Sequence, residues 1–392
     1  MNNAIEERVK PSYMLWQLVI YMLKLGTWGF GGPVALAGYM NRDLVEKYGW
    51  ITEADYKEGM ALAQMAPGPM AAQLAIYLGY VHYKIIGATL AGIAFVVPSF
   101  LMVVALGWAY VAYGDLAWMQ AVFYGVGAAV IGIIAISAQK LTKKTIGKDK
   151  LLLAIFLVLA ISTVITQSEI ASLVFAAGFI TLFVKAPPKW FKSGGLNGLA
   201  VTQVPAFTSI WGSFDVSLLG QIAIFFTKAG TFVFGSGLAI VPFLYGGVVV
   251  EHHWLTEKQF VDAVAVAMIT PGPVVITVGF IGYLIAGFTG ASVAALATFV
   301  PCYLFTIIPA PYFKKYGKNP SLVAFIDGVT AAAVGAITGS VIVIAQRSIV
   351  DIPTAALAIV TTALLWKYKK LTEPVVVIAA ALLGLVLYPM FH

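Results

Sequence analysis

The chain consists of long apolar runs separated by short polar stretches, without sustained two-residue alternation. Because a bilayer-spanning helix needs roughly 20 apolar residues, and lipid admits only backbones that satisfy their own hydrogen bonds, the pattern predicts membrane helices. The predicted segments are 13–40, 57–81, 86–113, 119–139, 151–166 and 170–185, followed by 217–245, 261–285, 290–313, 323–345, 352–366 and 374–390.

The composition strengthens this prediction. Hydrophobic residues make up 60% of the 392 residues and charged residues only 10%, whereas soluble domains carry about 25% charge. The chain is therefore expected to be an all-α polytopic membrane protein. The single cysteine, Cys302, excludes a disulfide framework or a thiolate metal site, and the four histidines are scattered. We expect no cofactor, no metal and no enzymatic activity, and Lys-rich cytoplasmic loops explain the +7 charge without nucleic acid.

The chain is internally duplicated. At an offset of 204 residues, the Trp-x-Thr-Glu motif that begins at Trp50 aligns with the one that begins at Trp254, and Pro67-Gly68-Pro69 aligns with Pro271-Gly272-Pro273. After one deletion the alignment continues, with Pro98 matching Pro301. The predicted domains are a first repeat at 1–190, a connecting segment at 191–216 and a second repeat at 217–392.

The charges in matching loops indicate that the repeats have opposite orientations. Loop 140–150 holds five lysines, whereas its counterpart holds only Arg347. The reverse applies to the preceding loop, where Gly114-Asp115 lacks basic residues and the matching loop carries Lys314, Lys315 and Lys318. Positive loops face the cytoplasm, so we predict inverted repeats. With an extra crossing at 195–214, the count is about 12–13 transmembrane helices, with the N-terminus inside and the C-terminus outside.

Two helix breaks recur in each repeat. The stretch 26–33 ends in Phe30-Gly31-Gly32-Pro33, and its counterpart contains Gly235-Ser236. The second break is the Pro-Gly-Pro motif. Such breaks persist in a membrane where they are buried or line a cavity, and paired breaks mark transporter sites. Half-helices that start at Pro33, Pro69 and Pro273 would direct N–H groups at an anion. The alternative is close glycine packing between helices.

Several charged residues within apolar runs are candidates for function. Lys24 and Lys228 are repeat partners that could supply positive charge to a dianion site, or could extend to the interface. Glu58 and Asp262, also partners, suit a proton relay or simply lie near water. Arg42 has no charged counterpart, so it is a candidate for anion selection or for a loop ion pair.

Two glutamines flank the first Pro-Gly-Pro motif, and their amides could bind an oxyanion or join helices. The complete set of candidate substrate-binding residues is Lys24, Phe30, Gly31, Gly32, Pro33, Arg42, Gln64, Pro67, Gly68, Pro69, Gln73, Lys228, Gly235, Ser236, Pro271, Gly272 and Pro273.

These motifs resemble the chromate ion transporter superfamily in its long two-domain form. The resemblance rests on Phe30-Gly31-Gly32-Pro33, on the run from Ala61 to Pro69, and on Gln73-Leu74-Ala75 with Gly79-Tyr80. It implies a bacterial or archaeal plasma-membrane protein that expels chromate, driven by the membrane potential or the proton gradient. Sulfate, which has the same shape and charge, is implied as a related substrate.

The second repeat departs from the motif, with Gly237 in place of Pro33 and Met268 in place of Gln64, so it need not hold the same ligand contacts. The expected partners are chromate, sulfate, the lipid bilayer and a second copy of the chain in a homodimer. The alternative functions are a permease for sulfate or another anion, and an anion channel.

Overall fold

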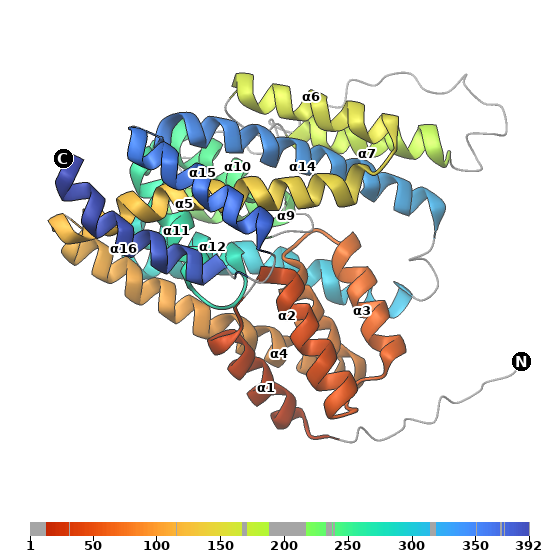
Figure 1. Cartoon of the computed structure of the whole chain (residues 1–392). Helices are drawn as coiled ribbons and strands as arrows, with labels where there is room; N and C mark the ends of the chain where they lie inside the picture. Colours follow the sequence, from red (N-terminus) through yellow and green to blue (C-terminus); the bar gives the residue numbers. More distant parts are fainter. Residues whose placement is uncertain are drawn as a thin grey trace, which may run out of the picture.

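The computed structural model describes residues 13–30, 32–114, 116–166, 171–187, 217–232, 237, 240–313, 319–349, 351–368, 371 and 373–391. Every regular element in these ranges is a helix (Figure 1). The first repeat contains α1 (Leu15–Trp28), α2 (Gly32–Met40), η1 (Asn41–Lys47), α3 (Glu53–Met65), α4 (Met70–Tyr113), α5 (Ala117–Ile146), α6 (Lys150–Thr166) and α7 (Ala171–Lys185). The second contains α9 (Leu218–Phe232), α10 (Ile240–Leu244), η5 (Tyr245–Glu251), α11 (Glu257–Ile269), η6 (Val274–Ile276), α12 (Thr277–Ile307), η7 (Ala310–Tyr312), α14 (Pro320–Ser348), α15 (Ile352–Lys367) and α16 (Glu373–Phe391).

The first apolar segment folds back on itself instead of crossing. The Tyr21 hydroxyl on α1 donates to the carbonyl oxygen of Tyr39 on α2 at 3.1 Å, and the rings of Tyr13 and Trp50 stack with centroids 5.0 Å apart. These contacts make α1 antiparallel to α2 and η1. The 14 residues of α1 extend about 21 Å, which is less than the roughly 30 Å hydrocarbon core. The sequence prediction of one crossing at 13–40 is therefore replaced by a hairpin.

A second hairpin forms at the Pro-Gly-Pro motif. A Cβ on Gly59 of α3 would meet the Tyr77 ring of α4, so the two helices run back along each other from the break. The α4 helix then reverses at Lys84, whose φ is 53°, and Gly79 closely approaches Gly87 beyond the turn. Its first part (70–83) is thus an arm of the hairpin, and its second part (85–113) is a long helix.

The equivalent long helices of the two repeats are antiparallel. The hydroxyl oxygens of Thr89 on α4 and Tyr303 on α12 lie 2.6 Å apart, while farther along the pair the rings of Phe100 and Phe288 meet edge to face with centroids 6.3 Å apart. Equivalent helices that run in opposite directions require a two-fold axis perpendicular to them. The prediction of inverted repeats is confirmed by this arrangement.

The C-terminal helices of each repeat pack against the other repeat. α5 contacts α15 and α16, and α14 contacts α6 and α7. Gly125 on α5 lies against the Ala380 carbonyl, and in the matching contact Gly328 on α14 lies against the Ala177 carbonyl. Small residues allow this close approach of membrane helices. The exchange brings buried residues of both repeats into shared hydrophobic clusters.

Helix length and composition support a multi-pass membrane protein. Five helical segments in the described part are long and apolar enough to cross a bilayer: 70–113, 117–146, 274–312, 320–346 and 374–391. Three shorter apolar helices occupy 150–166, 172–185 and 352–367. The prediction of an all-α polytopic protein with broken helices is therefore confirmed. The initial segments of each repeat are folded as hairpins, and the count of about 12–13 crossings stays a prediction.

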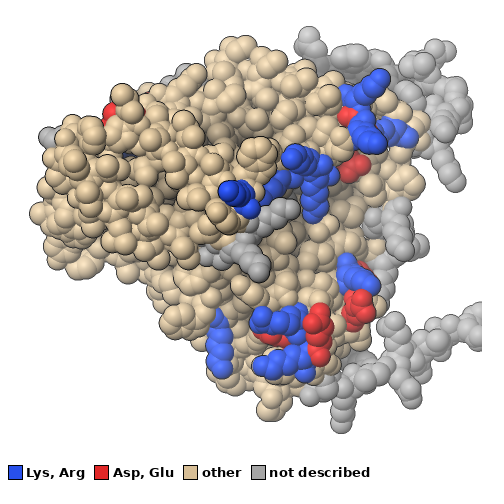
Figure 2. Space-filling view, in the orientation of Figure 1, with Lys and Arg blue, Asp and Glu red and all other residues tan. Residues whose placement is uncertain are grey.

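On the face shown in Figure 2, Lys and Arg side chains lie toward the right and along the lower edge, and the left part shows none. The lysine-rich end of α5 is on the same side as the start of α14, because Lys185 of α7 pairs with Asp149, and the Ser321 hydroxyl donates to the Ala186 carbonyl. The predicted crossing at 195–214 and the lysines at 314, 315 and 318 lie outside the described residues.

Candidate functional site

The first Pro-Gly-Pro break (66–69) has a backbone that glycine permits. Gly68 has φ 137°, a conformation that side chains rarely tolerate. A Cβ at this position would also lie 2.7 Å from Nε2 of Gln73 and 3.1 Å from Sγ of Cys302. Pro69 is the N-cap of α4, so the helix starts immediately after the break. The motif therefore ends α3 and starts α4 within a buried region.

The start of α4 is an uncommon, fully buried helix N-terminus. Met70, Ala71 and Ala72 are at most 6% exposed, and their N–H groups precede the first intrahelical bond, from the Gln73 N–H to the Pro69 carbonyl. Helix geometry provides these three donors with no acceptor of their own. Together with the positive end of the helix dipole, they form an arrangement that suits an anion.

Gln73 occupies the break itself and has an exposed fraction of 0%. Its Nε2 donates to the Pro67 carbonyl at 2.6 Å, so the amide donor stabilises the turn. Its Oε1 is buried and has no hydrogen-bond partner in the described structure. The backbone of the turn therefore already uses this amide donor, and a role of Gln73 in anion binding stays a prediction.

The second Pro-Gly-Pro break (270–273) is hydrogen-bonded to the first repeat and packs against it. Gly272 has φ 96°, and its N–H donates to the Gly29 carbonyl at 3.0 Å. A Cβ on Gly272 would lie 1.9 Å from Oγ of Ser99. Beyond Pro273 the chain first forms the 3-10 turn η6, and α12 begins only at Thr277. The predicted half-helix at Pro273 therefore starts later than at the first break.

Each Pro-Gly-Pro break contacts the long helix of the opposite repeat. Gly68 lies against Cys302 on α12, and Gly272 lies against Ser99 on α4. Ser99 and Cys302 are repeat partners, each directly after a proline, and the sequence analysis did not select them. The alignment of Pro98 with Pro301 was the sequence signal that could have identified Ser99 and Cys302. The structure thus brings the two breaks together on the crossing pair α4 and α12.

The glycine-rich breaks at the tips of the first hairpins are only partly described. Gly32 has φ 74° and begins α2, with Phe30 and Pro33 half-buried beside it. Val34 is 76% exposed, so the start of α2 lies at the surface, unlike that of α4. The predicted site residues Gly31, Gly235 and Ser236 lie outside the described residues.

The charged candidates of the first repeat lie at exposed positions. Lys24 is exposed on α1, whose buried residues include Leu25 and Gly26. Nε of Arg42 contacts Oδ1 of Asp43 at 2.8 Å, and this partner lowers the pKa of the Asp43 carboxyl. Of the two predicted roles for Arg42, the structure shows the loop ion pair. Gln64 is also exposed, whereas Gln73 is buried.

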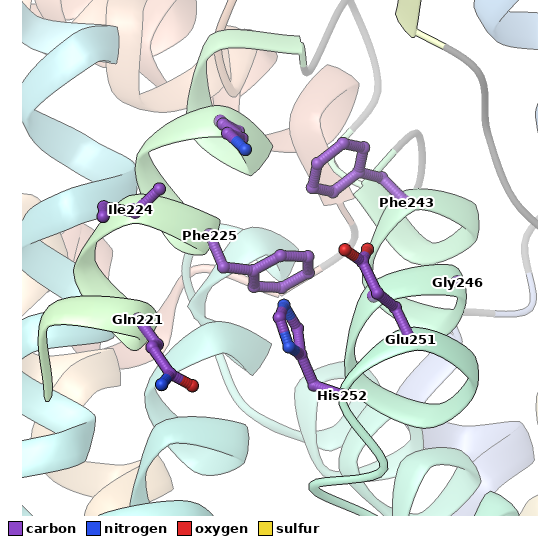
Figure 3. Close-up of a pocket in the computed structure, with 9 residues that line it drawn as sticks. Gln221, Ile224, Phe225, Phe243, Gly246, Glu251 and His252 are labelled. Atoms are coloured by element: carbon purple, nitrogen blue, oxygen red, sulfur yellow. The ribbon is translucent and has the colours of Figure 1, made fainter. Parts of the chain in front are cut away.

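Lys228 lines a separate pocket of about 340 Å³ between α9 and the π-helix η5. Figure 3 shows the ring of Phe225 between His252 and the side of the pocket that carries Phe243. The other lining residues are Gln221, Ile224, Gly246, Gly247 and Glu251. All of them belong to the second repeat, so the two repeat lysines do not line one pocket.

The two carboxylate candidates differ in their surroundings. Asp262 on α11 is 3% exposed, and its Oδ2 accepts a 2.8 Å hydrogen bond from the Tyr110 hydroxyl on α4. Glu58 on α3 is half-buried and interacts with Tyr77. The hydrogen bond of Asp262 therefore joins the two repeats. No group of three His, Cys, Asp or Glu residues suited to a metal occurs within the described ranges.

Comparisons of the sequence with known proteins identify its family. The chromate transporter family model matches residues 16–183 and again 220–385. The chain is 72% identical to a chromate transport protein of Cupriavidus metallidurans, over 97% of this chain and 95% of the relative. It is 60% identical to a probable chromate transport protein of Synechococcus elongatus over 97% of both chains, and 30% identical to a chromate transport protein of Pseudomonas aeruginosa over 99% and 96%. No solved structure matches. The chain belongs to the chromate transporter family.

Proposed function

We propose that this protein is a secondary transporter that moves chromate out of the cell. The observation that carries the proposal is the buried start of α4 at the first Pro-Gly-Pro break, within inverted repeats. Inverted-repeat transporters place their substrate at such discontinuous helices. The relative from Cupriavidus metallidurans, a chromate transport protein at 72% identity, supports chromate as the substrate.

The oxyanion binds at the first break. The N–H groups of Met70, Ala71 and Ala72 supply donors, while Gly68 and Pro69 shape the approach to them. The second break, 270–273, contacts α4 from the opposite repeat and closes the site from that side. Hydrogen bonds to an ionised acceptor are stronger than neutral ones, so three buried N–H groups can replace part of the hydration shell.

The protein lies in the plasma membrane with its lysine-rich side in the cytoplasm, following the positive-inside rule. The interior of the cell is electrically negative, so each exported negative charge gains about 2.3 kcal/mol per 100 mV. A proton gradient is the second candidate driving force, with Asp262 and Glu58 as the proton-binding groups. The proposal also includes domain boundaries at 190 and 217, a crossing at 195–214 and assembly of the protein as a homodimer.

Alternating access arises from movement between two sets of helices. One set comprises the hairpins and long helices α1–α4 and α9–α12, which carry the breaks. The other comprises the exchanged helices α5–α7 and α14–α16, which contact one another across the repeats. Rocking of the first set against the second would expose the break to each side in turn.

The test is chromate flux into proteoliposomes that contain the purified protein, under an imposed potential or an imposed pH gradient. Saturable, gradient-dependent uptake that shows counterflow is expected. Competition by sulfate measures how far the site accepts a second tetrahedral oxyanion. Current without saturation or counterflow would indicate an anion channel, and absence of flux from a correctly inserted protein would contradict the proposal.

A further inference from the structure

The buried amide of Gln73 carries an acceptor without a donor. Because Nε2 donates to the Pro67 carbonyl at 2.6 Å, the orientation of the amide is set and the remaining atom is Oε1. Oε1 is buried and finds no donor in the described part of the chain. Buried polar atoms are nearly always hydrogen-bonded, so this acceptor requires a partner that the protein itself does not supply.

This acceptor lies beside unused donors. Gln73 is the fourth residue of α4, and its side chain folds back into the break, where Cδ would lie 2.9 Å from a Cβ on Gly68. The N–H groups of Met70, Ala71 and Ala72 belong to the same helix turn. One buried place therefore offers several hydrogen-bond donors and a single acceptor.

We propose that this place binds the monoprotonated oxyanion, whose hydroxyl hydrogen is donated to Oε1 of Gln73. The inference rests on the proposed oxyanion transport and specifies the form of the substrate. A bare tetrahedral dianion has only acceptor atoms, so it would satisfy the N–H groups but would face the Gln73 oxygen with like polarity. A hydrogen oxyanion has three oxygens for the N–H groups and one O–H for the carbonyl oxygen.

The proposed contact distinguishes chromate from sulfate. Chromate takes up a proton near neutral pH, whereas sulfate does so only in strong acid. A site that requires a donated hydrogen rejects an analogue that lacks it, because the buried acceptor then stays unpaired. Two anions of the same shape are thus separated by their basicity, and the ion crosses the membrane with one negative charge.

The titratable side chains on the helices packed against α4 do not donate a hydrogen bond to Oε1 of Gln73 in the described structure. The packed elements α1, α2, α3, α11 and α12 carry Tyr21, Lys24, Tyr39, Glu53, Asp55, Tyr56, Lys57, Glu58, Glu257, Lys258, Asp262, Tyr283, Cys302 and Tyr303. Of these, Cys302 contacts the Gly68 position. Its thiol is fully buried, and no hydrogen bond joins it to Gln73 in the described structure.

The second break has no amide oxygen at the matching position. Thr277 replaces Gln73 there, and the N–H of Gly272 is already bonded to the Gly29 carbonyl. The protein is therefore expected to have one such site rather than two, despite its duplicated fold.

Equilibrium binding to the purified full-length protein tests the inference independently of flux. Isothermal titration at neutral pH would compare phosphate and arsenate, which carry a proton there, with sulfate, selenate and molybdate, which do not. We expect the first group to displace chromate about tenfold more effectively, and chromate itself to bind more tightly in mildly acidic than in mildly alkaline buffer. Equal displacement by both groups would overturn the inference.

Two variants locate the effect. Gln73→Met preserves side-chain length but removes the acceptor, and we expect it to abolish the preference for protonated oxyanions. Thr277→Val, at the matching position of the second repeat, should leave that preference unchanged. If Gln73→Met does not fold, the oxyanion series on the unaltered protein still decides the question. Normal selectivity in a folded Gln73→Met variant would contradict the role of Oε1, whereas absent chromate flux with intact selective binding would contradict transport alone.

Discussion

The hydroxyl of Tyr110 on α4 donates a 2.8 Å hydrogen bond to Oδ2 of Asp262 on α11, which joins the two repeats through a buried carboxyl. Asp262 is 3% exposed, and an uncompensated charge at such depth is costly. A carboxyl that alternates between protonated and ionised forms as its surroundings change can couple proton movement to a conformational step. The contact therefore identifies Asp262 as a stronger coupling candidate than its half-buried repeat partner Glu58.

Replacing Asp262 with Asn tests this assignment. The amide keeps the size of the side chain and a hydrogen-bond acceptor for Tyr110 but cannot release a proton. We expect at least about tenfold loss of chromate flux driven by a pH gradient, with chromate counterflow preserved, because exchange requires no net proton transfer. Flux into proteoliposomes under the two regimes is the measurement.

Two control variants accompany that experiment. Glu58→Gln should retain most of the pH-driven flux. Tyr110→Phe removes one hydrogen bond from a buried carboxyl, which costs about 1–3 kcal/mol, and should weaken coupling without eliminating it. Equal loss of driven flux and counterflow in Asp262→Asn would show that the carboxyl stabilises the fold rather than coupling protons.

Gly272→Ala should disrupt the contact between the second break and α4. Gly272 has φ 96°, where a non-glycine residue costs about 1–3 kcal/mol, and the new methyl group would overlap Oγ of Ser99. We expect a lower melting temperature in detergent and severe loss of chromate transport. Gly38→Ala is the matched control, because this helical glycine has no neighbour within 4 Å of an added Cβ. Similar melting temperatures for both variants would contradict a stabilising contact between the second break and α4.

Thiol crosslinking tests the exchange of helices between repeats. The Tyr388 hydroxyl on α16 donates to Oε1 of Gln120 on α5 at 3.0 Å, and Ser321 on α14 bonds to Ala186 at 2.8 Å. Cysteine pairs at 120 and 388, and at 186 and 321, should react with a short bifunctional thiol reagent. The buried Cys302 should not interfere. The mixed pair at 120 and 321 should remain uncrosslinked, and efficient reaction of that pair would refute the inverted arrangement.

The ion pair between Lys185 and Asp149 predicts a small acid sensitivity at the lysine-rich side. The hydrogen bond from Lys185 lowers the pKa of the Asp149 carboxyl in the folded protein. Its stabilisation is therefore fully present above the unfolded-state pKa of about 4 and is lost as the pH falls through the lower folded-state value. Because both side chains are partly exposed, we expect less than about 1 kcal/mol.

Melting curves measured across the acidic range provide the test. The unaltered protein should lose slightly more stability on acidification than Lys185→Gln, in which Lys185 no longer contributes to lowering the Asp149 pKa. Lys57→Gln, which removes an exposed ion pair with Glu53, is the matched control for loss of one surface charge. A steeper decline in Lys185→Gln than in the unaltered protein would contradict the expected sign.

The helix breaks were predictable from the sequence because their causes are local. Proline lacks the N–H group that continues a helix, and glycine tolerates the positive φ found at Gly68 and Gly272. The duplication was likewise visible in repeated motifs such as Pro-Gly-Pro, and the lysine distribution indicated inversion. The sequence therefore determined the fold class, the repeats, their relative orientation and the positions of the breaks.

The path of the chain through those breaks was decided by tertiary structure. Hydropathy is the same for a hairpin arm and for a crossing, so only contacts such as Tyr21 with Tyr39 show that the first segment turns back. The exchanged packing of α5 and α14 depends on close approach at Gly125 and Gly328, which involves residues of the opposite repeat. The use of the Gln73 donor by Pro67, which leaves Oε1 without a partner, is also decided there. The sequence determines what each residue can bond, but the packing of distant segments decides which of those bonds are made and which atoms remain for a ligand.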